Sequence, residues 1–212
     1  MDVASIIAEL DDHGFADTSP ERKLSAINFA IKNITQRKPF WKYVEKVVTI
    51  SFDGTSPVPT DSPADLRTVM KIMNLSTGQR VRPQRVDDME ENYSMHLLDS
   101  GDPTYYYFEG TQLRIWYVPG AGQTLRLRYL RTAPLVTATG NEASIIIPPD
   151  FHEAIIFRAL MRLYDLDDDP ELAARFEAHY ENVLAQMTEP ASTQQLDAPD
   201  FVHVVDDDDW DF

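Results

Sequence analysis

Residues 105–129 have the sequence YYYFEGTQLRIWYVPGAGQTLRLRY, and this stretch shows that the chain contains a β-sheet. Two aromatic and β-branched runs flank Glu109-Gly110, and a third run follows a Gly-rich turn. In the third run apolar residues alternate with arginines: Leu125, Arg126, Leu127, Arg128 and Tyr129. Period-2 alternation is typical of a strand with one buried and one solvent-exposed face. The stretch therefore predicts an antiparallel meander.

Further elements of this β region are expected on both sides of the meander. Residues 43–52 and 66–75 are rich in β-branched and apolar types, which favours two more strands. Residues 87–98 suit a short helix, since acidic residues near its start favour the positive end of the helix dipole. The run Ile145–Ile147 is expected to end the sheet.

Helices are expected before and after the β region. Apolar residues recur at helical spacing over residues 3–10 and again over 20–37, where Ser19 can cap the helix and Pro20 suits its first turn. Two more helices are expected after Asp150 and after Pro170. The short connection between them predicts an antiparallel hairpin.

This order predicts an α+β fold, a helical bundle core of about four helices with an inserted antiparallel β module and an extended C-terminal tail. The expected parts are the N-terminal helices of the core (1–42), the β module (43–147), the helical hairpin (148–188) and the acidic tail (189–212).

Composition limits the possible functions. The chain has 212 residues, a formal net charge of -16 and no cysteine. Such a charge argues against a dedicated nucleic-acid binder, which needs a basic surface. The lack of cysteine removes disulfides and thiolate chemistry. Residues 188–212 hold eight acidic residues and no Lys or Arg, half of the net charge. No apolar run reaches the roughly 18–20 residues of a membrane span, and no signal peptide is predicted.

Two sequence patterns resemble metal sites, but each lacks a residue that the site requires. His152-Glu153 lacks a second histidine at position 156, so a zincin is not predicted, and His152 is interpreted as a surface or interface residue at the start of a helix. Asp165, Asp167 and Asp169 have calcium-loop spacing, but Pro170 stands where glycine is needed. They are interpreted as an acidic loop that caps a helix.

No catalytic residue, metal or cofactor site is predicted. The four aspartates at 206–209 are interpreted as a solvated charge run, with weak binding of divalent cations as the alternative. No Gly-x-Ser-x-Gly motif is present.

Aromatic residues and arginines share the predicted meander. One hypothesis is a stacking platform for single-stranded nucleic acid, and the favoured one is ordinary cross-strand packing. The residues concerned are Tyr105, Tyr106, Tyr107, Trp116, Tyr117, Arg114, Arg126 and Arg128. Because arginine is enriched at protein interfaces, we expect that Arg114, Arg126 and Arg128 meet acids of a neighbouring subunit.

The N-terminal residues also carry a family resemblance. The run LDDHGFAD at 10–17, followed by Leu24, Ile27-Asn28, Ala30, Arg37 and Trp41, resembles the N-terminus of phage head–tail adaptor (connector) proteins. The later order of elements, including the Pro-Pro-Asp-Phe helix start at 148–151, is similar to that family as well.

The resemblance implies a structural virion protein and no enzyme. Members of that family form a ring, usually of twelve copies, that docks on the portal protein at the head–tail interface. The ring conducts double-stranded DNA without specific binding and receives a downstream tail or stopper protein. The expected location is the virion, after synthesis in the host cytoplasm, with no membrane partner and no cofactor.

The C-terminal tail is the part that the resemblance places against the portal. Its apolar residues suit a strand added to a partner's sheet and aromatic anchors at an interface. They are Phe201, Val202, Val204, Val205, Trp210 and Phe212. Two alternative functions stay open: a tail tubular or nozzle ring protein, and a metal-dependent hydrolase.

Overall fold

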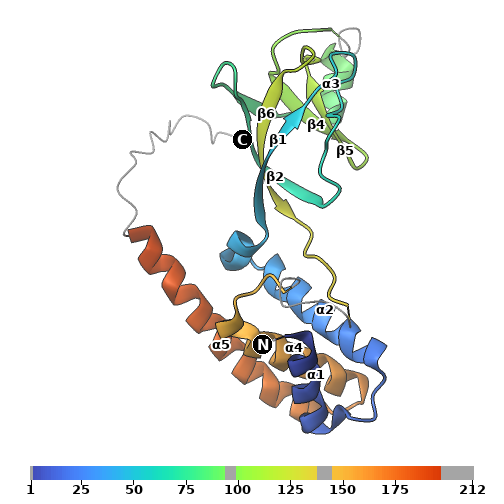
Figure 1. Cartoon of the computed structure of the whole chain (residues 1–212), viewed down its shortest axis with the longest axis vertical. Coiled ribbons are helices and arrows are strands. Elements are labelled where there is room, and N and C mark those ends of the chain that lie inside the picture. Colours follow the sequence, from blue (N-terminus) through green and yellow to red (C-terminus); the bar gives the residue numbers. More distant parts are fainter. Residues whose placement is uncertain (1, 94–98, 138–144, 197–212) are drawn as a thin grey trace. The chain divides into compact units, whose positions relative to one another are not determined.

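The chain folds into two compact units (Figure 1). The computed structural model describes residues 2–93, 99–137 and 145–196. Unit 1 comprises Met1–Phe40 and Pro134–Phe212, and unit 2 comprises Trp41–Ala133.

In its described residues, unit 1 is built from four α-helices. Their bounds are α1 Val3–Leu10, α2 Pro20–Gln36, α4 His152–Leu166 and α5 Pro170–Leu196. A π-helical turn, η1 (Asp11–Phe15), follows α1, and a 3-10 turn, η5 (Pro149–Phe151), precedes α4. Residues 189–196, assigned from sequence to the tail, continue α5.

Side-chain caps start the first two helices, and the Ser19 cap of α2 is the one that the sequence predicts. The Asp2 carboxylate accepts a hydrogen bond from the Ser5 backbone N–H at 2.7 Å, and the Ser19 hydroxyl accepts one from the Arg22 N–H at 3.3 Å. Both satisfy N–H groups that have no partner inside the helix. Gly14 supplies the positive φ of 97° that lets the chain turn between α1 and α2.

The apolar stripes of these helices meet in one core. Its largest fully buried side chains include Ile6, Leu10, Ile27, Ile31, Ile34 and Tyr180. Asn28 fastens the segment that enters from the β region, because its side-chain amide exchanges two hydrogen bonds with the backbone of Val136, at 2.7 and 3.0 Å. Ile145 and Ile147 are buried as well, but they lie in unit 1 and form no strand.

Unit 2 is a curled sheet of six strands with one short helix. The strands are β1 Glu45–Ser51, β2 Leu66–Asn74, β3 Arg80–Pro83, β4 Tyr105–Glu109, β5 Gln112–Trp116 and β6 Thr124–Arg131, and the helix is α3 Val86–Tyr93. A 3-10 turn, η2 (Lys38–Tyr43), leads into β1. The order across the sheet is β1-β6-β2-β3-β4-β5. All neighbouring strands are antiparallel except β3 and β4, which are parallel.

The predicted fold class is therefore wrong. The β part is not a small antiparallel module inserted in a four-helix bundle, because it is a mixed six-stranded sheet with its own hydrophobic core. Local periodicity finds individual strands, but it cannot show that β6 pairs with both β1 and β2, strands more than 50 residues earlier in the chain. These long-range pairs create the second core, which contains Ile50, Phe52, Ile72, Val81, Leu113, Ile115, Leu125, Leu127 and Tyr129.

The buried side of β6 gives a test of this second core. Leu127→Ala should lower the free energy of unfolding of unit 2 by about 2–5 kcal/mol, because it removes a fully buried side chain and leaves a cavity. The matched control is Leu75→Ala in the same unit. Because the Leu75 side chain is 51% exposed, this change should lower the free energy of unfolding by no more than about 0.5 kcal/mol. Chemical denaturation measures both. Equal losses in the two variants would contradict the assigned core.

Candidate interaction surface

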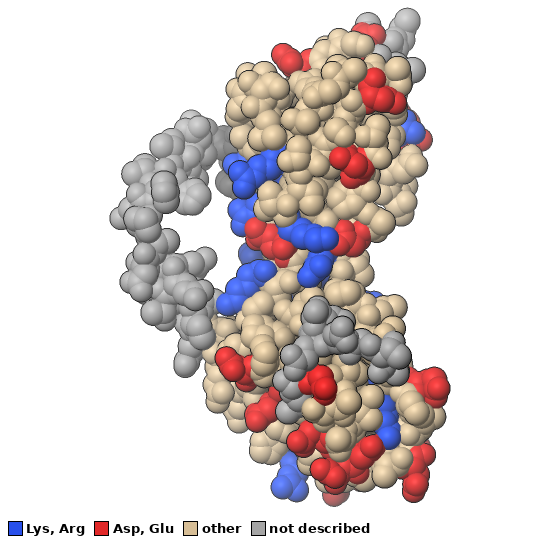
Figure 2. All heavy atoms as spheres, viewed as in Figure 1, with Lys and Arg blue, Asp and Glu red and all other residues tan. Residues whose placement is uncertain are grey.

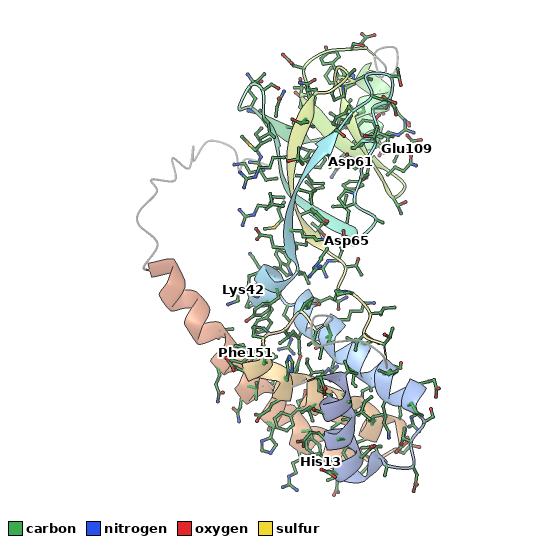
Figure 3. All side chains as sticks on the ribbon, in the orientation of Figure 1. His13, Lys42, Asp61, Asp65, Glu109 and Phe151 are labelled. Carbon is green, nitrogen blue, oxygen red and sulfur yellow. The ribbon has the colours of Figure 1, made fainter. Side chains whose placement is uncertain are left out.

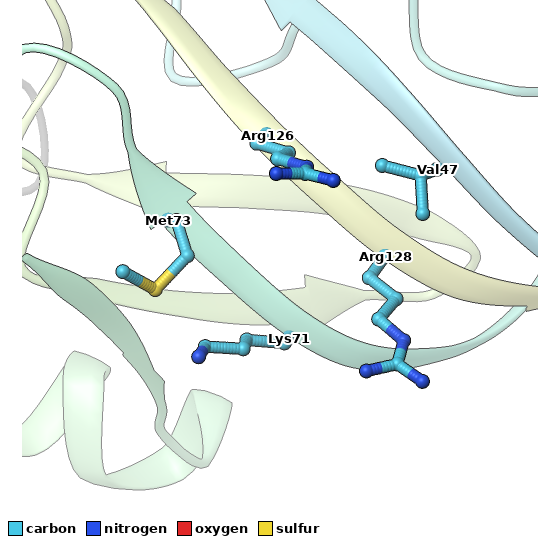
Figure 4. A pocket seen from close by; sticks show the side chains of 5 residues that line it. All are labelled: Val47, Lys71, Met73, Arg126 and Arg128. Atoms are coloured by element: carbon cyan, nitrogen blue, oxygen red, sulfur yellow. The ribbon is translucent and has the colours of Figure 1, made fainter. Parts of the chain in front are cut away.

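The solvent side of the sheet carries a cationic surface over β1, β6 and β2. Residues directly opposite one another on paired strands lie on the same face. The register pairs Arg128 with Val47 and Lys71, and it pairs Arg126 with Met73. These five side chains line a shallow pocket (Figure 4). We call them the cationic face.

One acidic residue, Glu45, forms an ion pair with the cationic face. Arg128 donates two hydrogen bonds to the Glu45 carboxylate, at 2.5 and 2.9 Å, and these bonds raise the pKa of Arg128. In the part of the chain that the structure describes, Arg126 and Lys71 make no ion pair. Figure 2 shows Lys and Arg side chains gathered along one flank of unit 2. The face therefore has cationic groups available for an external anion.

The outer edge of β1 borders this face. Among the described strands β1 pairs only with β6, and it lies at the end of the strand order. The Ser51 N–H donates to the Asp61 carboxylate and the Ser51 carbonyl accepts from the Thr60 N–H, at 2.8 and 3.0 Å. Both groups of Ser51 thus point away from β6. In an antiparallel pair this direction repeats every second residue, so Val47 and Thr49 also direct their N–H and C=O groups to the open edge.

On the opposite side of the sheet, the buried Tyr129 bonds to a carboxylate and so links neighbouring strands. The Tyr129 hydroxyl donates to the Asp65 carboxylate at 2.7 Å, and the Lys46 ammonium lies 3.1 Å from the other carboxylate oxygen. Asp65 is labelled in Figure 3. Burial and the bond to Asp65 raise the pKa of Tyr129. Burial tends to raise the pKa of Asp65, but the bonds from Tyr129 and Lys46 bring it below its ordinary value. This contact joins β6, β1 and the loop before β2.

Unit 1 carries an exposed aromatic residue between two arginines. The guanidinium groups of Arg158 and Arg162 lie 5.0 and 5.2 Å from the centre of the Phe29 ring, which is within cation–π range. Phe29 is 36% exposed. Aromatic residues and arginine are the types most enriched in interface hot spots, so this is a second candidate contact surface.

Acidic residues gather at the end of unit 1 that holds η1 and the α4–α5 connection. Arg22 pairs with Asp167, Lys23 pairs with Asp11, and the Tyr164 hydroxyl donates to the carbonyl of His13 (labelled in Figure 3). These contacts bring the two acidic loops together. Figure 2 shows Asp and Glu side chains over this end.

The structure brings together two of the three arginines predicted at an interface. Arg126 and Arg128 share the cationic face. Arg114 lies on β5, the opposite edge strand, and its Nε is 2.8 Å from the Glu109 carboxylate. The predicted tail residues from Phe201 to Phe212 lie outside the described residues.

The aromatic residues of the meander pack against one another. Tyr107 and Trp116 are buried with Met89 of α3 in a small cluster of their own. Tyr105 stacks on Trp116 with ring centres 5.8 Å apart. Tyr105 and Trp116 are partners on β4 and β5, so their contact is cross-strand packing.

The acidic loop and His152 have structural roles. Asp169 accepts a hydrogen bond from the Leu172 N–H at 3.2 Å and so caps α5. Among the described residues no group of three potential ligands could hold a metal ion, and the aspartates at 206–209 lie outside them. The surface interpretation of His152 is wrong, because the residue is 3% exposed and its Nε2 donates to the Ile147 carbonyl at 2.9 Å. Its ring holds the start of α4 against the preceding segment.

Comparison with known families identifies the chain. A family model described as SU10 adaptor protein matches residues 1–202. The chain belongs to this family of phage head–tail adaptors. The match covers both units and confirms the resemblance seen in the N-terminal residues. A comparison with curated proteins found no match.

Membership gives the adaptor a coarse role. It is a phage structural component of the virion and interacts with capsid, portal or tail components. No helix in the described ranges is long and apolar enough to cross a bilayer.

Sequence analysis missed part of the cationic face. Lys71, Met73, Val47 and Glu45 were not singled out, because residues 66–75 have an ambiguous period and the partner of that strand is far away in sequence. The usable signal was the Arg126/Arg128 alternation, which shows that β6 has an exposed cationic side but not which strands flank it.

The Asp65 carboxylate gives a pH test. Asp65→Asn should destabilise unit 2 by about 1 kcal/mol near neutral pH, because Tyr129 and Lys46 lose a charged acceptor. The pKa of Asp65 is lowered by folding, so the charged form contributes fully above the unfolded value of about 3.9 and its contribution is lost as the pH falls through the folded value. The difference from wild type should therefore shrink below about pH 4.

Denaturation at several pH values measures this difference. The exposed Asp102→Asn variant is the control and should match wild type throughout. A difference for Asp65→Asn that is the same at low and neutral pH would contradict the role given to its charge.

Proposed function

We propose that this chain is a head–tail adaptor that assembles as a ring of twelve copies on the portal, conducts the genome through its bore and presents the attachment surface for the tail. The family match over residues 1–202 carries this proposal, since it includes both units. The adaptor acts by binding other virion proteins and catalyses no reaction.

A ring needs two different, complementary surfaces on each copy, because every subunit meets its neighbours through a heterologous contact. The charge distribution supports such contacts. The cationic face lies on unit 2, and acidic loops lie at one end of unit 1. Of the arginines predicted at an interface, Arg126 is the best placed, since it is exposed and without an acidic partner among the described residues.

The C-terminal tail is proposed to bind the portal. Its apolar and aromatic residues are suited to anchoring, because buried aromatic side chains contribute much of the energy of an interface. The residues are Phe201, Val202, Val204, Val205, Trp210 and Phe212. Twelve tails in one ring would add avidity to modest single contacts.

The negative charge of the adaptor suits a DNA conduit. A net charge of -16 repels phosphate groups, so the genome can pass without specific binding. The ring would stand between the portal and a downstream tail or stopper protein.

Truncation after Leu196 tests the portal contact. The truncated chain keeps every described helix and strand and should retain the unfolding midpoint of the full chain. It should fail to form rings on purified portal in electron micrographs, whereas the full chain should form them. Trp210→Ala with Phe212→Ala should weaken docking, and Trp210→Phe with Phe212→Tyr should preserve it as the matched control.

Two outcomes would count against the proposal. Equal docking by the truncated and full chains would remove the tail from the portal contact. If the full chain does not bind the portal but binds a ring of another tail protein, the chain is a tubular or nozzle protein.

A further inference from the structure

We propose that helix α3 of one adaptor copy docks on the cationic face of the next copy, with Asp87, Glu90 and Glu91 against Arg126 and Lys71. The occupant is the helix Val86–Tyr93 of a second copy of this chain. The inference rests on the proposed ring and names the two surfaces that neighbouring subunits bring together. Both surfaces belong to unit 2, so the contact does not depend on how the two units are arranged.

The outer side of the curled sheet carries both surfaces. Leu127 of β6 and Ile115 of β5 belong to one buried cluster, so the sheet curls around a single core. Successive side chains of a strand point to opposite faces, so Arg126 and Trp116, each next to one of these core residues, lie on the outer side. Helix α3 covers that outer side at β4 and β5, where Met89 packs against Trp116.

The two surfaces face away from the shared core in different directions. The cationic face lies over β1, β6 and β2, and α3 lies over β4 and β5 at the other end of the strand order. A curled sheet turns its outer side from strand to strand, so one copy can meet a different neighbour with each surface. This is the heterologous contact that a closed ring needs.

Helix α3 presents carboxylates on one exposed side. Asp87, Glu90 and Glu91 are exposed, whereas Met89 is fully buried. Residues three and four apart are neighbours on a helix surface, so the three carboxylates form one patch. The helix contains no Lys or Arg, and none of the three acids makes an ion pair among the described residues.

The charges of the two surfaces match in sign and in spacing. Arg126 and Lys71 are exposed and have no acidic partner in the described ranges. Asp87 and Glu91 are separated by about 6 Å along the helix axis. That step is close to the roughly 6.6 Å between alternate residues of a strand, the spacing of Arg126 and Arg128. Complementary charges of this kind favour association and fix its register.

The cationic face also offers apolar surface to a helix. Its pocket has a volume of about 210 Å³, and Val47 and Met73 line it together with the three cationic residues. Val47 is 46% exposed. A helix laid into a shallow groove covers such side chains, and removing them from water stabilises the complex.

Two other polyanions compete for the same face: the acidic end of unit 1 and double-stranded DNA. At that end of unit 1, Asp167 and Asp11 are already paired with Arg22 and Lys23. The net charge of -16 opposes DNA. Unit 2 holds 11 basic and 11 acidic residues, so its net charge does not repel a second copy of itself. The free carboxylates of α3 are therefore the better match.

Disulfide crosslinking tests the contact, because the chain has no cysteine of its own. Two full-length variants with different affinity tags, Glu90→Cys and Val47→Cys, are mixed with purified portal, oxidised and resolved on a non-reducing gel. They should form a mixed dimer. The control replaces Glu90→Cys with Asp165→Cys, which also removes an exposed acid but lies at the acidic end of unit 1, and it should form none.

Charge reversal gives a second measurement. Arg126→Glu in every copy should lower the yield of complete rings on the portal about tenfold, because it brings like charges together. Glu90→Arg in the same chain should restore the yield. Both positions are exposed, so both variants should keep the unfolding midpoint of the wild type. Arg175→Glu, at an exposed position on α5, is the control and should leave the yield unchanged.

Four results would overturn the inference. Wild-type rings without the mixed dimer would exclude this contact and leave the proposed ring intact, whereas a wild-type chain that forms no rings would overturn the ring itself. A mixed dimer with Asp165→Cys in place of Glu90→Cys would assign the face to the acidic end of unit 1. Failure of Glu90→Arg to restore rings would remove α3 as the partner. Unchanged rings in Arg126→Glu, with lost binding of a double-stranded DNA oligonucleotide, would assign the face to phosphate.

Discussion

The sheet of unit 2 depends on the burial of one side of β6. Leu125, Leu127 and Tyr129 are fully or almost fully buried there, and β6 pairs with both β1 and β2. Burying these side chains removes a large apolar area from water, which is the main favourable contribution to folding. Because the register cannot shift by one residue without exposing all of them, the same constraint sets which side chains face solvent.

The cationic face follows from this constraint. When the leucines and Tyr129 point inward, Arg126 and Arg128 must point outward, and the register aligns them with Lys71 and Met73 on β2. The Tyr129–Asp65 bond and the Arg128–Glu45 pair further hold the three strands together. A binding surface on a well-packed sheet is rigid, so little conformational entropy is lost when a partner binds.

The separation into two units suits a protein that joins different partners. Each unit has its own core, so a contact made by one need not disturb the other. Unit 1 offers Phe29 between two arginines and an acidic end, whereas unit 2 offers a cationic face and an open strand edge. The family match covers both units, in keeping with an adaptor that uses more than one surface.

The sequence by itself determined the local elements and the family. Helical spacing located α1 and α2, with a cap predicted for α2, alternation located β5 and β6, and the N-terminal residues indicated a head–tail adaptor. Only the tertiary structure decided that the β region is a mixed six-stranded sheet, that Arg114 lies on the opposite edge strand from β1, and that His152 is buried. The physical reason is range: periodicity and capping act over a few residues, whereas strand pairing and burial depend on contacts between residues far apart in the chain.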